Sequence, residues 1–445
     1  MVIKKQPHRA NARSVALRVL LCCERQGAWL DGTLKRELGK SGLSSRDAAL
    51  CSNLCYGVCQ NEMLLTFWLS HFSKVKPEKL ESAVRLSLLM AMYQIVMLDR
   101  IPERAAVHEA VELARRNSKN PRSPALVNGI LRSFCRRQND LPQPKDLSTR
   151  YSHPKWLVDL LDDALDHGGT EALLACNNSH PPTTVQTNTL RITPEALQQE
   201  LEAEGVAVEL HPWLPGCLTL RATGDLEALA SFQEGHFLVQ DAASRLAVLA
   251  AGPQPGMTVL DACAAPGGKS FSACFQMEDR GEIHSCDIHA GKLRQIQAGA
   301  RRLGLNSLKT AQADGKKRYV EWEKHFDLVL CDAPCSGLGI IRKKPDIRRK
   351  DPEPLLELPT VQRAILDNVS GYVKPGGVLL YSTCTVLRRE NEEIVLAFLE
   401  QHPEYMLESF TLPGIGQVKE GFVTLWPHIH GTDGFFMAKL RRKHD

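Results

Sequence analysis

Apolar and polar positions alternate with helical spacing over the first 140 residues. In the stretch from Val84 to Leu98, for example, the apolar residues Leu88, Met92, Ile95 and Leu98 are spaced by three or four positions, which is the period of an α-helix. Helix starts are also legible, at the polar run Ser44–Asp47 and just after Pro102. Strand-like alternation is absent. The pattern predicts an all-α domain of six or seven helices over residues 1–140.

A polar stretch with two prolines, residues 138–146, then predicts a linker. The segment up to residue 235 mixes the two periods. We expect helices at 154–166 and 194–204 and strands at 184–190 and 218–221. Residues 141–235 are therefore predicted to form a linker and a small α+β subdomain.

From residue 236 the pattern becomes regular. The strands that we expect lie at 258–261, 282–287, 308–311, 326–331 and 377–381, and the helices at 241–251, 269–277, 291–303 and 355–373. Strands that alternate with helices are typical of a parallel sheet covered on both faces. Residues 236–445 are thus predicted to form an α/β doubly wound, Rossmann-like domain.

Two cysteines follow predicted strands of this domain. Asp332 and Cys335 come directly after the run 326–331, and Cys384 comes after the run 377–381. Residues just past the carboxyl ends of parallel strands line the ligand crevice of such a sheet. Two thiols and a carboxylate in one crevice indicate nucleophilic catalysis. For a single strand-end cysteine the usual alternative is a small apolar core residue, and we expect that for Cys263, Cys286 and Cys331.

The turn after the strand at 258–261 predicts a cofactor site. Its small residues let a backbone approach a ligand, and the following helix start offers free N–H groups to an anion. The glycine spacing fits neither a P-loop nor a dinucleotide fingerprint. Asp287 ends the next strand, where ribose hydroxyls are bound in nucleotide-binding folds, and Asp314, at the third strand end, is placed to accept from an exocyclic amine. The alternative is that Asp287 and Asp314 only cap turns.

A cofactor with adenosine at one end and a carboxylate at the other fits these groups, and S-adenosyl-L-methionine is such a molecule. The cofactor-binding residues that we predict are Cys263, Ala264, Ala265, Pro266, Gly267, Gly268, Lys269, Asp287, Asp314 and Asp332.

Two thiols beside a methyl donor suit one difficult reaction. Carbon 5 of cytosine is a poor nucleophile, but a thiolate that adds at carbon 6 turns the ring into an enamine that can take a methyl group. The adduct must then lose its carbon 5 proton and expel the thiolate. Two cysteines and an aspartate supply a nucleophile, an assistant to elimination and a partner for the base edge. The thiolate needs a lowered pKa.

Charge is distributed unevenly along the chain. The net charge is +4, but residues 1–142 hold 23 Lys and Arg against 12 Asp and Glu, a balance of +11, and the remainder holds 32 against 39, a balance of −7. A basic half favours a polyanionic partner, and a solubilised helical surface is the alternative. Directly after the Asp332 motif, a basic segment is predicted to bind RNA phosphates, although such a run can also be a solvated face. Its residues are Arg342, Lys343, Lys344, Arg348, Arg349 and Lys350.

The fourteen cysteines form no regular framework, and apolar neighbours fit reduced thiols in a cytoplasmic protein. Cys51, Cys55 and Cys59 share one helix face, but one face cannot close a tetrahedral metal site, so we expect no metal. No apolar run approaches the ~20 residues of a membrane span.

Segment 236–445 resembles the RNA cytosine-C5 methyltransferases of the NOL1/NOP2/Sun family. The motifs that carry the resemblance are Asp261–Lys269, Asp287, Asp314, Asp332–Gly337, Ser382–Thr385 and Gly431–Phe436. The resemblance implies that Cys384 is the nucleophile, that Cys335 assists product release, and that Asp332 touches the cytosine and the methionine end of the cofactor. DNA cytosine methyltransferases use the Pro-Cys cysteine as nucleophile instead, so reversed roles stay open. Leu338 and Thr385 depart from the usual motif.

The first 140 residues resemble the RNA-binding factor NusB through Leu54–Val58, Ala105–Ala114 and Val127–Arg132, and Tyr151–Leu157 is similar to the bacterial branch of the family. This combination implies methylation of 16S rRNA, at position 967, either free or in an early small-subunit precursor. We expect a monomer with no DNA or membrane partner. The alternatives are the same chemistry on tRNA, a DNA methyltransferase, and a non-catalytic RNA-binding ribosome-assembly factor.

Overall fold

The computed structural model describes residues 11–165, 168–221 and 224–444. The chain forms two compact units, which we call the helical unit and the sheet unit. The helical unit consists of Met1–Asp162, Gly169–Asn178 and Lys343–Lys350, and the sheet unit of Asp163–Gly168, Ser179–Arg342 and Asp351–Asp445. The expected subdomain 141–235 is therefore divided between the two units. No helix in the described ranges combines the length and apolarity that crossing a bilayer requires.

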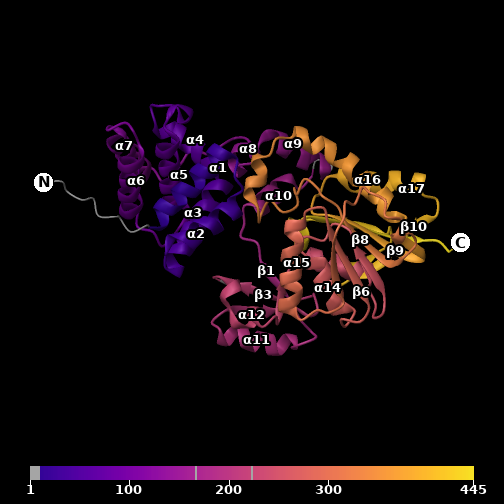
Figure 1. Ribbon diagram of the computed structural model, residues 1–445. Helices are drawn as coiled ribbons and strands as arrows, with labels where there is room; N and C mark the ends of the chain where they lie inside the picture. The colour runs from indigo at the N-terminus through magenta and orange to yellow at the C-terminus, as the bar shows by residue number, and fades with distance from the viewer. Residues whose placement is uncertain (1–10, 166–167, 222–223, 445) are drawn as a thin grey trace. The chain divides into compact units, whose positions relative to one another are not determined.

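The helical unit is drawn mainly in indigo and purple in Figure 1. Its helices are α1 (Ala12–Gln26), α2 (Leu30–Ser41), α3 (Ser45–Gln60), α4 (Glu62–Phe72), α5 (Ser82–Met97), α6 (Glu103–Asn117), α7 (Ser123–Arg136), α8 (Leu147–Tyr151) and α10 (Thr170–Asn177), with the short turns η1 (Pro77–Lys79) and η4 (Pro345–Arg349). Helix α9 (Lys155–Ala164) follows α8, and its last two residues belong to the sheet unit. The all-α expectation for the N-terminal region is confirmed.

Helix α5 forms the centre of this unit. Eleven of its sixteen residues are buried, around its whole circumference, so it lies inside the helical core instead of presenting one apolar face. Gly57 of α3 allows the close packing, because a Cβ atom there would lie 1.9 Å from the ring of Tyr93.

The sheet unit contains a small sheet and a large one. The small antiparallel sheet has the order β2-β3-β1-β4 and packs on α11 (Pro194–Ala203). Its strands are β1 (Thr183–Thr187), β2 (Ala207–Leu210), β3 (Cys217–Arg221) and β4 (Phe237–Val239), with η2 (Leu226–Ala228) and α12 (Ala230–Gln233) before β4.

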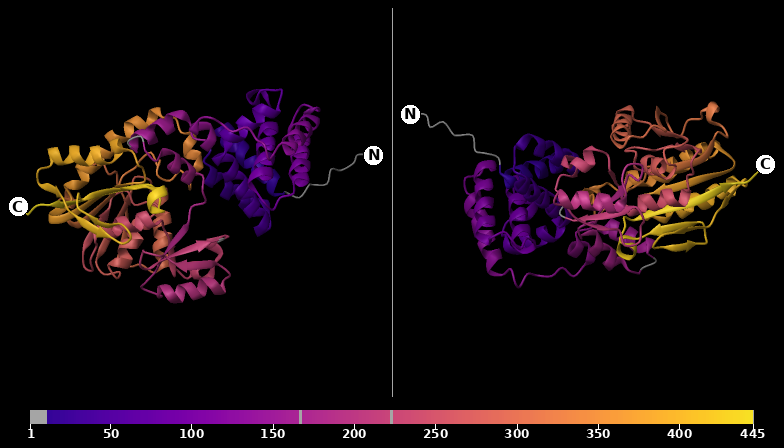
Figure 2. Two further views of the ribbon diagram at one scale, coloured as in Figure 1. Left: turned by 180° about the vertical axis from the view of Figure 1, so that it is seen from behind. Right: turned by 90° about the horizontal axis from the view of Figure 1, so that it is seen from below.

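The large sheet has the order β10-β14-β9-β8-β5-β6-β7, with β13 paired to β14. Its parallel strands are β5 (Thr258–Asp261), β6 (Glu282–Asp287), β7 (Leu308–Gln312), β8 (Phe326–Asp332) and β9 (Val373–Thr383). The antiparallel additions are β10 (Tyr405–Leu407), β13 (Phe422–Leu425) and β14 (Phe435–Arg442), and β11 (Phe410–Leu412) and β12 (Gly416–Val418) form a separate hairpin. Figure 2 shows the C-terminal strands in yellow in both views.

Helices cover both faces of the large sheet. Alternate strand residues point to opposite faces, so Val259 belongs to one core cluster and Leu260 to the other. The first cluster includes α13 (Ala242–Ala251), α14 (Gly268–Gln276) and α15 (Ala290–Leu303), and the second includes α16 (Leu358–Ser370) and α17 (Glu392–Gln401). The remaining short helices are η3 (Val320–Trp322), η5 (Glu353–Glu357), η6 (Arg388–Glu390) and α18 (Pro427–His430). This is the doubly wound arrangement predicted from the sequence.

The strand order reverses between β5 and β8. From β5 the chain builds outward to β6 and β7 on one side, and then returns to add β8 and β9 on the other. In open α/β sheets the ligand crevice lies at the carboxyl ends of the strands at such a reversal. Asp261 is the last residue of β5, and Asp332 is the last residue of β8.

Candidate active site

The structure brings the two strand-end cysteines together. Strands β8 and β9 are parallel, with Asp332 paired to Ser382, so their following loops leave the sheet at the same edge. Cys335 and Cys384 lie on these loops with their Sγ atoms 3.2 Å apart, and both side chains are half-buried. The pair therefore combines contact between the thiols with access from outside.

The two thiols have opposite pKa shifts. The hydrogen bond from Cys335 and the positive charge of Lys269 lower the pKa of Cys384, against burial and the carboxylates of Asp332 and Asp433. The hydrogen bond to Cys384 and burial raise the pKa of Cys335 well above its usual range. These opposite directions favour Cys384 over Cys335 as the more readily ionised thiol of the pair.

Asp332 is held by two partners beside these thiols. Lys269 Nζ donates to Asp332 Oδ2 at 2.7 Å, and Ser382 Oγ donates to Asp332 Oδ1 at 2.8 Å. Lys269 is 8% exposed, and its ammonium group lies 4.9 Å from the centre of the Phe435 ring. Burial lowers the pKa of Lys269, but the nearby carboxylates outweigh it and the net pKa is raised. The cation is therefore permanent at neutral pH.

The Lys269→Met variant is expected to move the ionisation of Cys384 to higher pH. The ammonium favours the thiolate, so its loss raises the thiol pKa, and the alkaline rise in reactivity shifts upward by about one pH unit. The rate of Cys384 alkylation by iodoacetamide, followed by mass spectrometry between pH 6 and 10, measures this directly. The control is Ser382→Ala, which also removes a partner of Asp332 but no charge, and should leave the profile in place. An unmoved profile in Lys269→Met would refute the assignment.

A buried polar network supports the two cysteine loops. Glu390 is fully buried, and its Oε2 accepts from the backbone N–H of Ser336 and from Gln362 Nε2, both at 2.9 Å. Ser336 Oγ donates to Thr385 Oγ1 at 2.8 Å. Thr385, one of the two departures from the usual motif, therefore links the two cysteine loops through this hydrogen bond. Leu338, the other departure, is buried in its loop. Sequence reasoning missed Glu390 and Gln362, because no local pattern marks a carboxylate whose partners lie 54 and 28 residues away.

The cofactor turn lies between β5 and α14. Ala264 and Gly267 are joined by a hydrogen bond of 2.6 Å between Gly267 N–H and the Ala264 carbonyl, and the Ala265–Pro266 peptide is cis. Gly267 has φ 109°, and a Cβ there would lie 2.6 Å from the Phe271 ring, so only glycine fits. The turn delivers the chain to the N-terminus of α14, where Gly268 is the first residue.

Asp261 stabilises the start of this turn from the protein interior. It is fully buried, and its Oδ2 accepts from Ser270 Oγ at 2.7 Å. Burial raises the pKa of Asp261 to about 7. Ser285 Oγ in turn donates to Ser270 Oγ at 2.7 Å, which ties α14 to β6. These contacts give Asp261 a structural role beneath the turn.

Asp287 and Asp314 stand at the next two strand ends. Asp287 is 7% exposed, accepts from His289 N–H at 2.8 Å and lies 3.6 Å from Lys292 Nζ. Asp314 accepts from Lys316 N–H at 3.0 Å and borders a small cavity together with Ala262 and Cys286. The turn-capping contacts are thus present, and Asp314 also lines the cavity. Helix-start N–H groups at one end and carboxylates at the other fit an adenosyl amino acid.

The cysteines expected to be core residues differ in exposure. Cys286 and Cys331 are almost fully buried, and burial raises the pKa of both thiols. Cys263, which we also predicted at the cofactor, is half-buried, and burial together with the surrounding carboxylates raises its pKa. None of the three is an ionised nucleophile.

The sequence of the basic segment after the Asp332 motif predicts an exposed surface, but several of its side chains are buried in the structure. Arg342 is 6% exposed and donates to the Thr432 carbonyl at 3.3 Å, and Arg348 is 4% exposed. Arg349 is ion-paired with Glu62 at 2.5 Å. These arginines are occupied by protein acceptors because the segment folds into the units instead of standing free. Lys343 and Lys350 are half-buried, and Lys344 is exposed.

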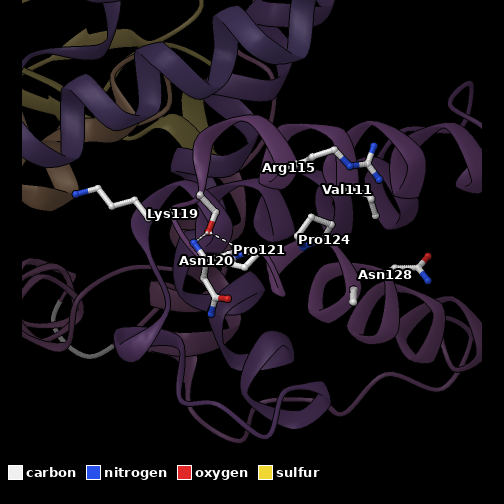
Figure 3. A pocket seen from close by; sticks show the side chains of 9 residues that line it. Val111, Arg115, Lys119, Asn120, Pro121, Pro124 and Asn128 are labelled. Atoms are coloured by element: carbon white, nitrogen blue, oxygen red, sulfur yellow. Dashed lines mark hydrogen bonds between the residues drawn. The ribbon is translucent and has the colours of Figure 1, made fainter.

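The helical unit contains a separate pocket, shown in Figure 3, with a volume of about 690 Å³. It lies between the end of α6 and the start of α7, and Arg115, Lys119 and Asn128 are among its lining residues. Exposed arginines and lysines on α6, on α7 and on the residues directly next to them are Arg104, Arg115, Arg116, Lys119, Arg122, Arg132, Arg136 and Arg137. The positive charge predicted for this region is therefore accessible here.

Three family models match consecutive parts of the chain. The NusB family matches residues 10–136, a ferredoxin-like domain of RsmF/B-like methyltransferases matches residues 153–227, and the 16S rRNA methyltransferase RsmB/F family matches residues 248–441. These matches confirm the predicted fold class, with an all-α NusB-like domain, a small α+β subdomain and a Rossmann-like domain.

Full-length relatives agree with the models. Probable ribosomal RNA small subunit methyltransferase B of Bacillus subtilis (strain 168) is 36% identical, over 98% of this chain and 99% of the relative. The protein of the same name from Synechocystis sp. (strain ATCC 27184 / PCC 6803 / Kazusa) is 34% identical, over 97% and 99%. The solved structure titled "Crystal Structure of PH0851" superposes with a TM-score of 0.80 at 27% identity, covering 99% of this chain and all of that one.

The doubly wound fold, the cofactor turn and these matches define a methyltransferase whose methyl donor is S-adenosylmethionine, as the sequence predicted. The family can be stated more narrowly, because the relatives cover nearly the whole chain. This chain belongs to the ribosomal RNA small subunit methyltransferase B family.

Proposed function

We propose that this protein methylates carbon 5 of a cytosine in 16S rRNA, at position 967, through a covalent adduct with Cys384. One observation carries the proposal, namely the contact of 3.2 Å between two half-buried thiols at the ends of adjacent parallel strands. A methyltransferase that acts on a more nucleophilic atom needs no such pair. The names of the relatives, which specify the small-subunit ribosomal RNA, support the substrate.

The directions of the two pKa shifts support the following order of steps. The Cys384 thiolate forms a bond to carbon 6 of the base, and the electron pair displaced from the carbon 5–carbon 6 bond makes carbon 5 nucleophilic. After methylation a base removes the carbon 5 proton, the double bond re-forms, and the bond from sulfur to carbon 6 breaks. Cys335, which holds its proton, stabilises the departing thiolate by hydrogen bonding across the 3.2 Å contact.

Asp332 and the cofactor turn position the two reactants. Asp332 has its carboxylate fixed by Lys269 and Ser382 beside both thiols, which suits hydrogen bonding to the amino edge of cytosine. Residues 263–269, Asp287 and Asp314 would hold S-adenosylmethionine, which supplies an electrophilic methyl group when bound. Because the reacting base must enter a crevice, the target cytosine is unpaired or flipped out of its helix.

The exposed cations of α6 and α7 are proposed to bind the rRNA backbone. Replacing both Arg115 and Lys119 by alanine is expected to weaken rRNA binding about 3- to 10-fold and to lower the slope of log K against log[salt] by about one to two. Fluorescence anisotropy with a labelled rRNA fragment at four salt concentrations gives both values. The pair Glu195→Ala and Glu202→Ala, on the exposed face of α11, is a control for surface substitution. An unchanged slope would exclude this pocket from the interface.

Methyl transfer to defined RNAs tests the function as a whole. Unmodified 16S rRNA, an early small-subunit precursor particle, tRNA and a DNA of the same sequence as the rRNA target would each be incubated with labelled S-adenosylmethionine, and the product nucleotide would be mapped by mass spectrometry. We expect 5-methylcytosine in the 16S rRNA. Label in tRNA alone would refute the substrate, label in DNA would refute RNA specificity, and no label in any acceptor would favour a non-catalytic assembly factor.

Three further expectations belong to this proposal. The functional domains are residues 1–140, 141–235 and 236–445, the protein is cytoplasmic, and it acts as a monomer. Sedimentation velocity with and without the rRNA fragment decides the last of these.

A further inference from the structure

The segment Lys343–Lys350 belongs to the helical unit although it directly follows the loop of Cys335. Its anchor is Arg348, whose guanidinium meets five oxygen atoms. Nη1 donates to the carbonyls of Gln60, Tyr151 and Ser152 at 2.6, 3.4 and 3.2 Å, and Nη2 donates to the Asn177 carbonyl at 3.1 Å and to Asn178 Oδ1 at 2.6 Å. We call these five acceptors the Arg348 socket.

The residues of the socket are held in place by contacts of their own. Ser152 adopts the left-handed conformation with φ 55°, and Asn178 Nδ2 donates to the Tyr151 carbonyl at 2.9 Å. His153 is fully buried, with its Nδ1 2.7 Å from the same carbonyl, and burial and the Arg348 charge hold its pKa well below its usual range, so it stays neutral. A guanidinium buried to 4% exposure is destabilising unless its donors are matched, and this socket supplies acceptors for both Nη groups, although Nε has no hydrogen-bond partner in the described part of the chain.

Two neighbouring contacts fasten the same segment. Asp346 Oδ2 accepts from the N–H of Leu30 at 2.9 Å, in the first turn of α2, where a negative charge complements the helix dipole. Arg349 pairs with Glu62 in the first turn of α4. Residues 346–349 are therefore fixed to three different helices or turns of the helical unit.

The other end of the loop is fixed within the sheet unit. Gly339 N–H donates to the Cys384 carbonyl at 3.0 Å, and Gly434 N–H donates to the Gly339 carbonyl at 2.8 Å. Arg342 donates to the Thr432 carbonyl at 3.3 Å. Only Lys343 to Pro345 separate this attachment from Asp346, so the covalent link between the two anchors is short.

We propose that Arg348 is a positioning residue for methyl transfer: its socket in the helical unit restrains, through the continuous chain, the loop that holds Cys335 against Cys384. The inference rests on the proposed function for its catalytic consequence, but the restraint itself is independent of the substrate. It also gives the Tyr151–His153 turn a role, since two of the socket carbonyls come from it.

Amide hydrogen exchange on the full-length protein tests the restraint. In Arg348→Ala the amide of Gly339 and its neighbours in residues 335–342 should exchange at least about tenfold faster than in wild type, because the loop opens locally. Arg348→Lys keeps the charge but cannot reach all five acceptors, and should give an intermediate rate. Arg46→Ala, an exposed arginine of α3, is the matched control and should leave the rate unchanged.

Kinetics test the consequence for catalysis. We expect kcat for rRNA methylation to fall about tenfold in Arg348→Ala, while KM for S-adenosylmethionine stays within twofold, because the socket residues lie apart from the cofactor turn in sequence and in unit. If Arg348→Ala does not fold, Asn178→Ala, which removes one acceptor, should show the same changes at smaller size.

A folded Arg348→Ala protein with wild-type exchange in residues 335–342 would overturn the proposal, and so would wild-type kcat. These failures are separate from failure of the proposed function. If the wild-type protein methylates no cytosine, the exchange experiment still decides whether the socket restrains the loop.

Discussion

Replacing Cys384 by alanine is expected to abolish methyl transfer, with a loss of at least about 10³-fold in kcat, because it removes the thiol proposed to form the bond to carbon 6. The hydrogen bond from Cys335 and the charge of Lys269 lower the pKa of Cys384, which favours it as the nucleophile. Transfer of labelled methyl from S-adenosylmethionine to 16S rRNA measures the loss. Cofactor affinity, measured by calorimetry, should be retained, which shows that the variant is folded.

RNA that contains 5-fluorocytidine at the target sharpens this experiment. Fluorine replaces the proton that a base must remove, so the adduct forms but cannot decay. Wild-type protein should give a complex with this RNA that survives denaturing electrophoresis, and Cys384→Ala should give none. A stable complex with Cys384→Ala would show that Cys335 is the nucleophile, which is the reversed assignment known from DNA cytosine methyltransferases.

Cys335→Ala is expected to have the second largest effect and a different one. The nucleophile remains, so the adduct still forms, but the departing thiolate loses its hydrogen-bond donor at 3.2 Å. Turnover should fall about 10²-fold or more, the scale of a lost proton-transfer partner. With ordinary rRNA the protein–RNA complex should now accumulate, and denaturing gels over a time course record it.

The double variant Cys335→Ala and Cys384→Ala is the matched control and should form no complex. If Cys335→Ala turns over normally with no accumulation, the thiol has no part in elimination. The 3.2 Å contact would then serve only to lower the pKa of Cys384.

The sequence predicted the sheet and its strand ends well, because both depend on local patterns. The apolar runs before Asp332 and Cys384 are long enough to identify buried strands, and their position at strand ends follows from parallel pairing. The short C-terminal strands, such as β10 and β13, were not predicted, because three or four residues carry too little periodicity. They pair antiparallel with β14, which itself pairs antiparallel with β9, and these strands together make the sheet mixed.

The basic segment shows the limit of local patterns more clearly. Six cations in nine residues indicate an exposed phosphate-binding surface, but Arg348 is buried among acceptors up to 288 residues away. The positive charge of an arginine allows it to bind either a phosphate or a carbonyl oxygen. Which of the two lies next to it depends on the folded structure and not on the neighbouring sequence. Glu390 was missed for the same reason, since its partners come from the distant Cys335 loop and from helix α16.

The Arg348 socket also constrains the order of events during synthesis. A chain leaves the ribosome from its N-terminus, so the last socket residue, Asn178, emerges 170 residues before Arg348. At roughly 5–20 residues per second the interval is about 8 to 34 seconds. During this time the four carbonyls and one side-chain amide of the socket must form hydrogen bonds with water or with other groups. The helical unit is therefore completed only when the segment Lys343–Lys350 has been synthesised, and this segment is connected to the Cys335 loop that the socket is proposed to restrain. A nascent chain stalled before residue 343 should be cleaved by protease near Tyr151–His153 more readily than one stalled well past residue 350.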